Sequence, residues 1–150
     1  MLSKDNVLGV SGRVWILRGI SSHLRYASLG EARELQSRQP ALGRPESRCA
    51  ALIPISKSPD WWGLAQDQRL DILRNQSRHI EEGKRFLPAI ARALFHCRDL
   101  NENLPFDFLT WFEFSPSDSQ AFDELLGVLR ATPEWRYVNR EVELRLELDA

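Results

Sequence analysis

The sequence has no uncharged apolar run near the roughly 18–20 residues that a membrane-spanning helix requires. Its opening residues, MLSKDNVLGV, contain no long apolar core and no clear cleavage site, so no signal peptide is predicted. Neither charge dominates, because 20 basic side chains face 21 acidic ones, and this balance argues against a general nucleic-acid binder. We therefore expect a cytoplasmic protein with neither a membrane nor a nucleic acid as its partner.

Cysteine is also scarce. Cys49 and Cys97 are the only two, and their spacing is not that of a CxxC motif, so two reduced thiols are expected. A chain of 150 residues, 43% of them hydrophobic, is long enough for one domain with a real core and short for two. We expect residues 1–150 to form a single domain.

The first third of the chain has the pattern of a strand, a helix and another strand. Residues 14–20, VWILRGI, are rich in β-branched and aromatic side chains and predict a strand. Ser28 and Glu31 have the spacing of a capping box, which predicts the start of a helix. Residues 49–56, CAALIPIS, predict a buried strand in which Pro54 indicates a sheet edge or a bulge.

A long helical region is expected to begin at Asp60. Its near-helical spacing is carried by Leu73, Ser77, Ile80, Leu87, Ile90 and Leu94. Residues 106–114, FDFLTWFEF, alternate as a strand does, with Phe106, Phe108, Thr110, Phe112 and Phe114 on one face.

The C-terminal part predicts one more helix and one more strand. Ser117 and Gln120 form a second possible capping box. The apolar stripe that follows comprises Phe122, Leu125, Leu126 and Leu129. Residues 137–148 alternate again and predict a strand. Strands with half-apolar alternation, separated by amphipathic helices, indicate an α+β fold, and we expect a ferredoxin-like antiparallel sheet with helices on one face.

His79 and Arg92 lie thirteen positions apart in QSRHIEEGKRFLPAIARALFHCRDL, with Gly83 and Pro88 between them. In one straight helix they would be about 20 Å apart along the axis. Gly83 and Pro88 favour a break, after which a second helix can fold back so that the two side chains converge on a flat object. The residues alone also allow a solvated histidine and an arginine paired with a carboxylate, an anion or water.

The segments SRHIEEGKRFLPAIARALFHCRDL and PFDFLTWFEF, together with RYASLGEARELQSRQPALGRPESRCAALIPISKSPDWW, resemble the chlorite dismutase family. The chain is most similar to its short-subunit, dimeric branch, over roughly residues 13–148. The resemblance implies the haem-binding dimeric α+β barrel superfamily, a haem b cofactor held against one side of the sheet, and a homodimer. Relatives carry a first strand ahead of the segment that matches VWILRGI, so an N-terminally shortened domain is expected.

The resemblance also assigns roles to single residues. His79 in SRHI matches the axial ligand of the haem iron, and Arg92 in AIARAL matches the catalytic arginine on the opposite side. Glu134 in TPEW matches the carboxylate that supports the histidine, and Lys57 in ISKSPDWW matches the lysine that joins them. The further cofactor-binding residues it implies are Tyr26 and Trp61 beside the haem and its propionates, and Leu94, Thr110 and Phe112 in the distal lining.

Each implied role has a physical reason. A carboxylate that accepts the second ring proton of an axial histidine fixes its tautomer and makes it a stronger ligand. A neighbouring lysine keeps that carboxylate ionised in an apolar setting. A permanently charged arginine offsets the desolvation of an entering anion such as chlorite, while Phe112 and Leu94 exclude water.

The activity implied by the resemblance is the decomposition of chlorite to chloride and dioxygen. Two alternatives remain at this point. One is a related haem enzyme, either a coproheme decarboxylase or a peroxidase, although Arg92 speaks against the decarboxylase because those relatives generally lack this arginine. The other is a non-catalytic haem-binding remnant, which the shortened start favours.

Overall fold

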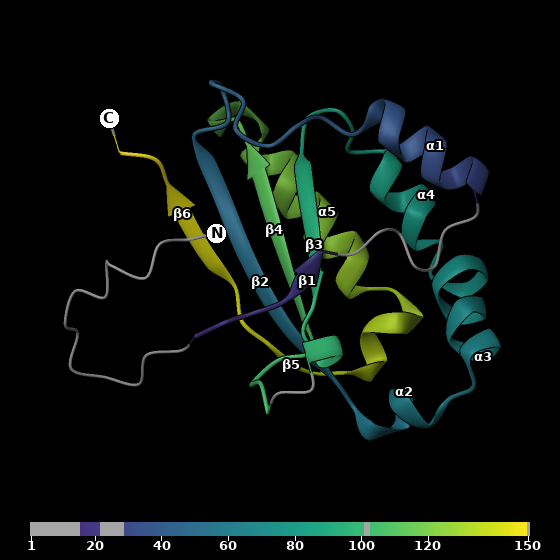
Figure 1. Ribbon diagram of the computed structural model, residues 1–150. Coiled ribbons are helices and arrows are strands. Elements are labelled where there is room, and N and C mark those ends of the chain that lie inside the picture. The colour runs from purple at the N-terminus through teal and green to yellow at the C-terminus, as the bar shows by residue number, and fades with distance from the viewer. Residues whose placement is uncertain (1–15, 22–28, 101–102, 150) are drawn as a thin grey trace.

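The strands form one antiparallel sheet, seen in Figure 1. The structure is a computed structural model that describes residues 16–21, 29–100 and 103–149. Within these residues the strand order is β1–β3–β4–β2–β5, and β6 also pairs with β2. The strands are β1 (Ile20–Ser21), β2 (Cys49–Lys57), β3 (Ala91–His96), β4 (Phe108–Phe114), β5 (Val138–Glu141) and β6 (Leu144–Glu147). The α+β fold with an antiparallel sheet is therefore confirmed.

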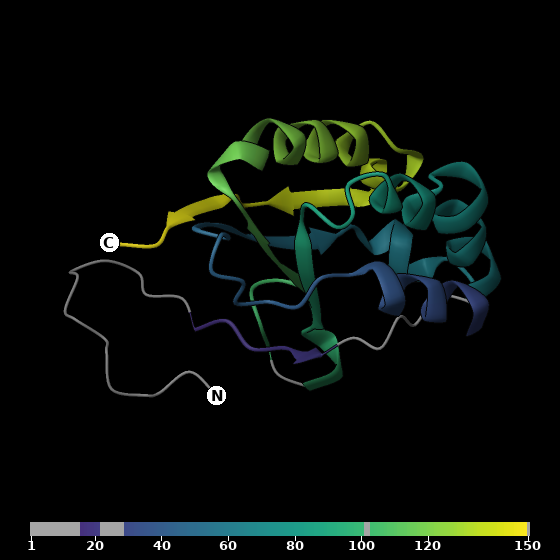
Figure 2. The ribbon, with the colours of Figure 1, turned by 90° about the horizontal axis from the view of Figure 1, so that it is seen from above.

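The helices lie mainly to the right of the sheet and behind it in Figure 1. They are α1 (Leu29–Arg38), α2 (Pro59–Gly63), α3 (Gln66–Asp71), α4 (His79–Lys84) and α5 (Ser119–Arg130), with a π-helical turn at Ile72–Gln76 and a 3-10 turn at Pro133–Tyr137. Figure 2 shows α5 lying along one side of the sheet. The predicted apolar stripe of α5 is confirmed, because all four of its residues are buried against that side.

Aromatic packing holds α5 on the sheet. Phe122 is fully buried, and its ring centroid lies 4.4 Å from that of Phe114 and 5.1 Å from that of Phe112. Burial of an aromatic side chain in such a cluster stabilises a domain by about 3–5 kcal/mol, judged by truncation to alanine. This cluster therefore fixes the end of the sheet that carries Phe112.

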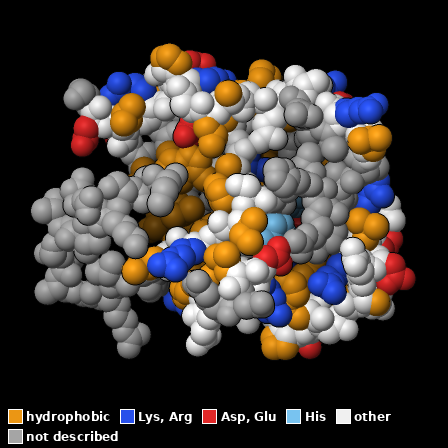
Figure 3. Space-filling view, viewed as in Figure 1, with side chains coloured by type: hydrophobic (Ala, Val, Ile, Leu, Met, Phe, Trp, Pro, Cys, Tyr) orange, Lys and Arg blue, Asp and Glu red, His pale blue; other side chains and the backbone are white. Residues whose placement is uncertain are grey.

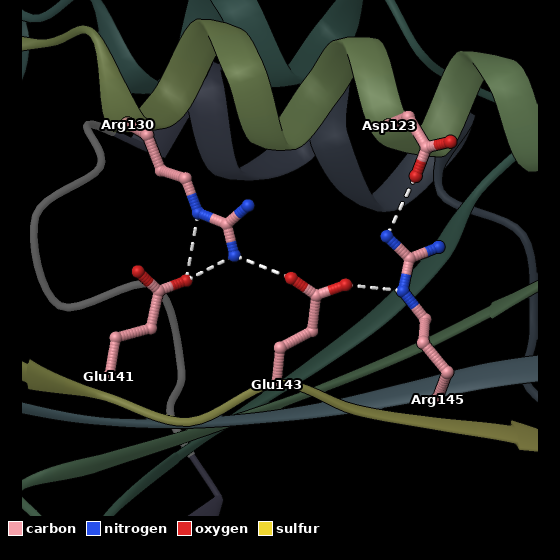
Figure 4. A network of polar contacts seen from close by, with 5 residues as sticks. All are labelled: Asp123, Arg130, Glu141, Glu143 and Arg145. Atoms are coloured by element: carbon pink, nitrogen blue, oxygen red, sulfur yellow. Dashed lines mark hydrogen bonds and ion pairs between the residues drawn. The ribbon is translucent and has the colours of Figure 1, made fainter.

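An exposed network of ion pairs joins α5 to the strands β5 and β6 (Figure 4). Arg130 binds Glu141 through Nε at 2.9 Å and Glu143 through Nη2 at 2.6 Å. Arg145 binds Asp123 of α5 through Nη2 at 2.7 Å and also contacts Glu143. Because these groups are partly exposed, the pairs contribute little singly and mainly fix the register between helix and sheet edge.

The second face of the sheet is packed by strands and loops. Its cluster comprises Cys97, Phe106 and Leu109 with Leu17, Leu52, Phe95, Leu104 and Val142. In the space-filling view of this face, hydrophobic side chains gather in a hollow over the strands (Figure 3). Phe106 was predicted on the other face, with Phe108. It packs here instead because β4 begins only at Phe108.

The expected strand over residues 137–148 is two strands on the same neighbour, β2. The interruption between Glu141 and Leu144 falls opposite Pro54, which has no N–H to donate to a ladder. The prediction that Pro54 marks a sheet edge or a bulge is wrong, because β2 lies inside the sheet and its register shift comes later, between Ser56 and Lys57.

The long helical region predicted from Asp60 is wrong beyond Lys84. The chain turns over residues 85–90 and then forms β3, which carries Arg92 and Leu94. Pro88 lacks the N–H that a helix needs and disfavours helical geometry at Leu87. Arg92 therefore returns towards His79 on a strand, and no second helix forms there.

Three local predictions also need correction or fall outside the description. Ser117 lies in a 3-10 turn before α5, whose N-cap is Asp118, and Gln120 binds Glu124, so the second capping box does not form. Ser28 and the side chain of Glu31 lie outside the described residues. The strand predicted over residues 14–20 is described only from residue 16, and just Ile20 of it belongs to β1.

Candidate functional site

A half-open cavity lies between the sheet and the helices α4 and α5. It encloses about 1050 Å³ of empty space, including solvent at its mouth. Its sheet wall consists of Ile53, Ile55 and Lys57 of β2, Arg92, Leu94 and His96 of β3, and Phe108, Thr110 and Phe112 of β4. His79, Ile80, Leu126, Leu129, Glu134 and Trp135 line the other side, and Leu73 and Arg74 complete it. The cavity is mostly apolar, with a few polar groups that converge on it.

Three polar side chains from distant parts of the sequence meet at one side of the cavity. Lys57 Nζ donates to Glu134 Oε1 at 2.7 Å. The other carboxylate oxygen, Oε2, lies 2.9 Å from Nδ1 of His79. Both atoms are buried from solvent, and neither makes a hydrogen bond with a described residue, so their contact is an ion-pair contact. Glu134 therefore bridges the lysine and the histidine.

Local structure explains why these groups meet. His79 is the first residue of α4, and Arg78 before it has a left-handed backbone with φ 48°, which redirects the chain out of the preceding π-helical turn. The buried Ser77 hydroxyl accepts a bond of 3.0 Å from the backbone N–H of Glu134. The backbone N–H of Ser58 donates to the carbonyl of Tyr137 at 2.7 Å. The turn that carries Glu134 is thus fixed both to α4 and to the end of β2.

The electrostatics of this group favour an ionised carboxylate. Burial by itself raises the pKa of Glu134, but His79 and Lys57 together outweigh burial and lower this pKa to about 2. Burial lowers the pKa of Lys57, and Glu134 opposes that shift. The lysine Nζ also lies 3.5 Å from the ring centroid of the fully buried Trp61, a cation–π contact that helps to hold a charge away from water.

The part of the sheet wall that carries Arg92 is set by the pairing of β3 with β4. Arg92 lies opposite Phe112, Leu94 opposite Thr110, and His96 opposite Phe108. Burial lowers the pKa of Arg92, with Glu134 opposing the shift, yet a guanidinium stays charged at any ordinary pH. Among the described carboxylates none forms an ion pair with Arg92, so its charge remains available to a ligand.

A second cavity, with about 540 Å³ of empty space, meets the first at His79 and Arg92. It extends between α4, α5 and the turn before β3, and Gln39, Phe86, Ile90 and Leu125 are among its lining residues. His79 and Arg92 therefore border the same hollow space, and Arg92 comes there on β3 and not on the second helix that was expected.

The structure places most of the other predicted residues, but not all, in this space. Leu94, Thr110 and Phe112 line the large cavity. Trp61 does not line it; this residue is buried behind Lys57, and its ring lies 5.4 Å from that of Tyr137. Its Nε1 is buried without a hydrogen-bond partner among the described residues. Tyr26 lies outside the described residues.

Sequence reasoning missed several residues at the cavity, among them His96 and Gln39. His96 is buried on the same face of β3 as Arg92, and its ring meets that of Phe108 edge-on at 5.2 Å. Alternation would have found His96 if residues 91–96 had been predicted as a strand. Gln39 borders the smaller cavity and donates from Nε2 to the carbonyl of Arg92, 53 positions away, a contact for which the sequence carries no signal.

These features fit a flat iron porphyrin. Its apolar ring matches the apolar walls, and Glu134 occupies Nδ1 of His79, so that Nε2 is the nitrogen left for a metal. The described residues hold no group of three or more His, Cys, Asp or Glu side chains placed to bind a bare metal ion. A porphyrin brings four nitrogen ligands of its own and needs only one from the protein. No described helix is long and apolar enough to cross a membrane.

The fold and the cavity together define the class of protein. It is an α+β protein whose antiparallel sheet forms one wall of an apolar pocket lined by a histidine and an arginine. The sequence model described as chlorite dismutase matches residues 2–146. The chain belongs to the chlorite dismutase family, which confirms the resemblance found in the sequence.

Known relatives show how far this similarity reaches. A chlorite dismutase from Ideonella dechloratans is 32% identical over 123 residues, which are 81% of this chain and 40% of that protein. The dimeric chlorite dismutase from Nitrobacter winogradskyi has 54% identity and a TM-score of 0.83, with 87% of this chain and 75% of that one covered. A mutant chlorite dismutase from Candidatus Nitrospira defluvii has 25% identity and a TM-score of 0.70, with 88% and 53% covered. The chain thus spans well under half the length of its curated relative.

Proposed function

We propose that this chain binds haem b through His79 and decomposes chlorite to chloride and dioxygen. The observation that carries the proposal is that the Lys57–Glu134–His79 group and an arginine with no ion pair to a described carboxylate line the same cavity. Membership of the chlorite dismutase family supports the same activity. The overall change, ClO₂⁻ to Cl⁻ and O₂, balances without any further reactant.

Glu134 would hold the Nδ1 proton of His79, which fixes the tautomer and makes Nε2 a stronger donor towards iron. Lys57, which donates to the other carboxylate oxygen at 2.7 Å, would help to keep Glu134 ionised. The bound haem would supply the oxygen-transfer chemistry, while the protein positions the reactants.

Arg92 is proposed to attract and retain anions at the opposite side. Its charge is permanent and forms no ion pair with a described carboxylate, so an entering chlorite would meet a cation that does not first have to leave a carboxylate. Leu94 and Phe112, beside it on the cavity wall, would exclude water while the reaction proceeds.

We also propose that residues 1–150 act as one domain, that the chain forms a homodimer, and that it works in the cytoplasm. The similar structure from Nitrobacter winogradskyi is dimeric. Apolar side chains exposed on and beside β6, among them Leu144, Leu146 and Leu148, support an interface there. Light scattering of the purified protein tests the homodimer, and fractionation of cells tests the location in the cytoplasm.

The experiment for the activity begins with purified protein and added haem. We expect a Soret band of a ferric, five-coordinate haem, followed by dioxygen release on an oxygen electrode when chlorite is added. A normal Soret band without dioxygen release would mean that the protein binds haem but does not decompose chlorite. If no Soret band forms, the proposed haem binding would also be contradicted.

A further inference from the structure

The segment that follows α1 lies across the turn that joins α4 to β3. Arg44 donates from Nη1 to the carbonyl of Pro88 at 3.2 Å and from Nη2 to that of Ala89 at 2.9 Å. One residue earlier, Gly43 has φ 79°, which a side chain would strain, and its N–H donates to Glu113 Oε2 at 2.6 Å. The segment is thus attached to the start of β3 and to the end of β4.

The two carbonyls that Arg44 binds have a particular place in the chain. They immediately precede Ile90 and the first residues of β3, of which Arg92 is the second. Backbone bonds within the turn reach the carbonyls of Gly83, Lys84 and Phe86. Within the described part of the chain no backbone N–H outside the helices and strands reaches those of Pro88 or Ala89. Arg44 supplies the donors for both.

Arg44 lines neither cavity, so it does not touch a ligand there. Its side chain is 24% exposed and has Glu46 at 3.6 Å on its outer side. A charged fork that binds two adjacent carbonyls fixes both the position and the direction of that backbone, which a single neutral hydrogen bond does not. The strand that starts two residues later inherits this direction.

We propose that Arg44 is a positioning residue for Arg92. By holding the carbonyls of Pro88 and Ala89, it sets the angle at which β3 leaves the turn and thus the place of the guanidinium above the cavity. The inference rests on the proposed function only in taking Arg92 as the group that meets an anion at the haem.

Arg48 provides a matched control. It also donates from Nη2 to a carbonyl, that of Leu148, at 2.8 Å, and it follows Arg44 by only four residues. Its bond fixes the chain after β6, which is not part of either cavity wall. Replacing either arginine by alanine therefore removes a comparable charge and a side-chain-to-carbonyl contact, but only one of them precedes β3.

The test measures the dissociation constant of fluoride from the ferric haem-loaded protein by optical titration. We expect Arg44→Ala to raise this constant about five- to tenfold, the size of a modest coupling between sites, with the haem content unchanged. Arg48→Ala should leave it unchanged. In an Arg92→Ala background, Arg44→Ala should produce no further change. Arg44→Lys, which cannot bind both carbonyls as a fork, should fall between wild type and Arg44→Ala.

An unchanged fluoride constant in Arg44→Ala would overturn the proposal. So would an equal rise in the Arg92→Ala background, which would mean that Arg44 acts on the fold alone. If Arg44→Ala does not fold, the fluoride dissociation constant of Arg44→Lys is measured instead, in the wild-type and the Arg92→Ala backgrounds, and the same criteria apply.

A second readout needs no cofactor. In the ¹⁵N spectrum of the haem-free protein, the Arg92 Nε–H signal should move in Arg44→Lys and not in Arg48→Lys. A stationary signal would contradict the inference even if the protein never binds haem, whereas a missing Soret band alone would contradict the proposed function.

Discussion

The two sides of the cavity treat buried charge in opposite ways. On one side Lys57 and Glu134 neutralise each other at 2.7 Å and are both nearly inaccessible, with His79 attached to the same carboxylate. Arg92 of β3 is partly buried on the cavity wall with Leu94 and Phe112, and it forms no ion pair with a described carboxylate. An ion pair such as Lys57–Glu134 is suited to a permanent structural role. A cation without an ion pair, such as Arg92, is suited to binding an anion that enters and leaves. The difference predicts how variants on each side should behave.

The largest effect is expected for His79→Ala. Removal of the imidazole leaves no described ligand of the right kind beside Glu134, so the five-coordinate ferric haem spectrum should be lost. Added imidazole should restore part of that spectrum, because the space of the side chain is then free. An unaltered spectrum without imidazole would mean that His79 is not the iron ligand.

Arg92→Ala should leave haem binding intact and reduce turnover of chlorite by about 10²–10³, the usual cost of losing one electrostatic donor at a reacting centre. Self-bleaching should increase, since the anionic fragment is retained less well. The unfolding free energy of the haem-free protein should be equal to that of wild type or higher, because a partly buried cation with no ion pair to a described carboxylate is lost. Unchanged turnover and lifetime would show that Arg92 is not the retaining group.

Glu134→Gln should destabilise the haem-free protein, in contrast to Arg92→Ala. It leaves Lys57 buried without an anion and should lower the unfolding free energy by about 3–5 kcal/mol, the range for a broken buried pair. Glu143→Gln in the exposed network of Figure 4 is the control, with less than about 1 kcal/mol expected. Urea denaturation measures both, and equal losses would contradict the contrast between buried and exposed pairs.

Acidification should remove part of this stability. The folded pKa of Glu134 is about 2, below its ordinary value of 4.5, so its contribution is complete above pH 4.5 and declines as the pH falls towards 2. A shift of this size corresponds to about 3 kcal/mol. In the haem-free protein, the difference in unfolding free energy between wild type and Glu134→Gln should therefore shrink over that range. A constant difference would mean that the carboxylate is not held ionised by its neighbours.

The sequence predicted the elements whose periodicity is carried by one clearly apolar face. The strands predicted over residues 49–56 and 106–114 correspond to β2 (Cys49–Lys57) and β4 (Phe108–Phe114), and the stripe from Phe122 to Leu129 is buried on α5. It failed for β3, because Leu94 continues the near-helical spacing of Leu87 and Ile90, so that residues 91–96 resemble a continuing helix.

Contacts across long stretches of sequence were less accessible. Glu134 lies 55 positions after His79, and only the resemblance to a family brought the two together before the structure did. The roles of Gln39 and Arg44 depend on a loop crossing a turn, for which no local pattern exists. His96 was not predicted as a cavity residue because β3, the strand that carries it, was not predicted.

A crystal structure of the haem-loaded protein tests the central claim most directly. We expect the iron bound to Nε2 of His79, with Nδ1 still held by Glu134 and the guanidinium of Arg92 above the opposite face of the ring. Iron bound to His96, or a haem outside the space between His79 and Arg92, would contradict the account.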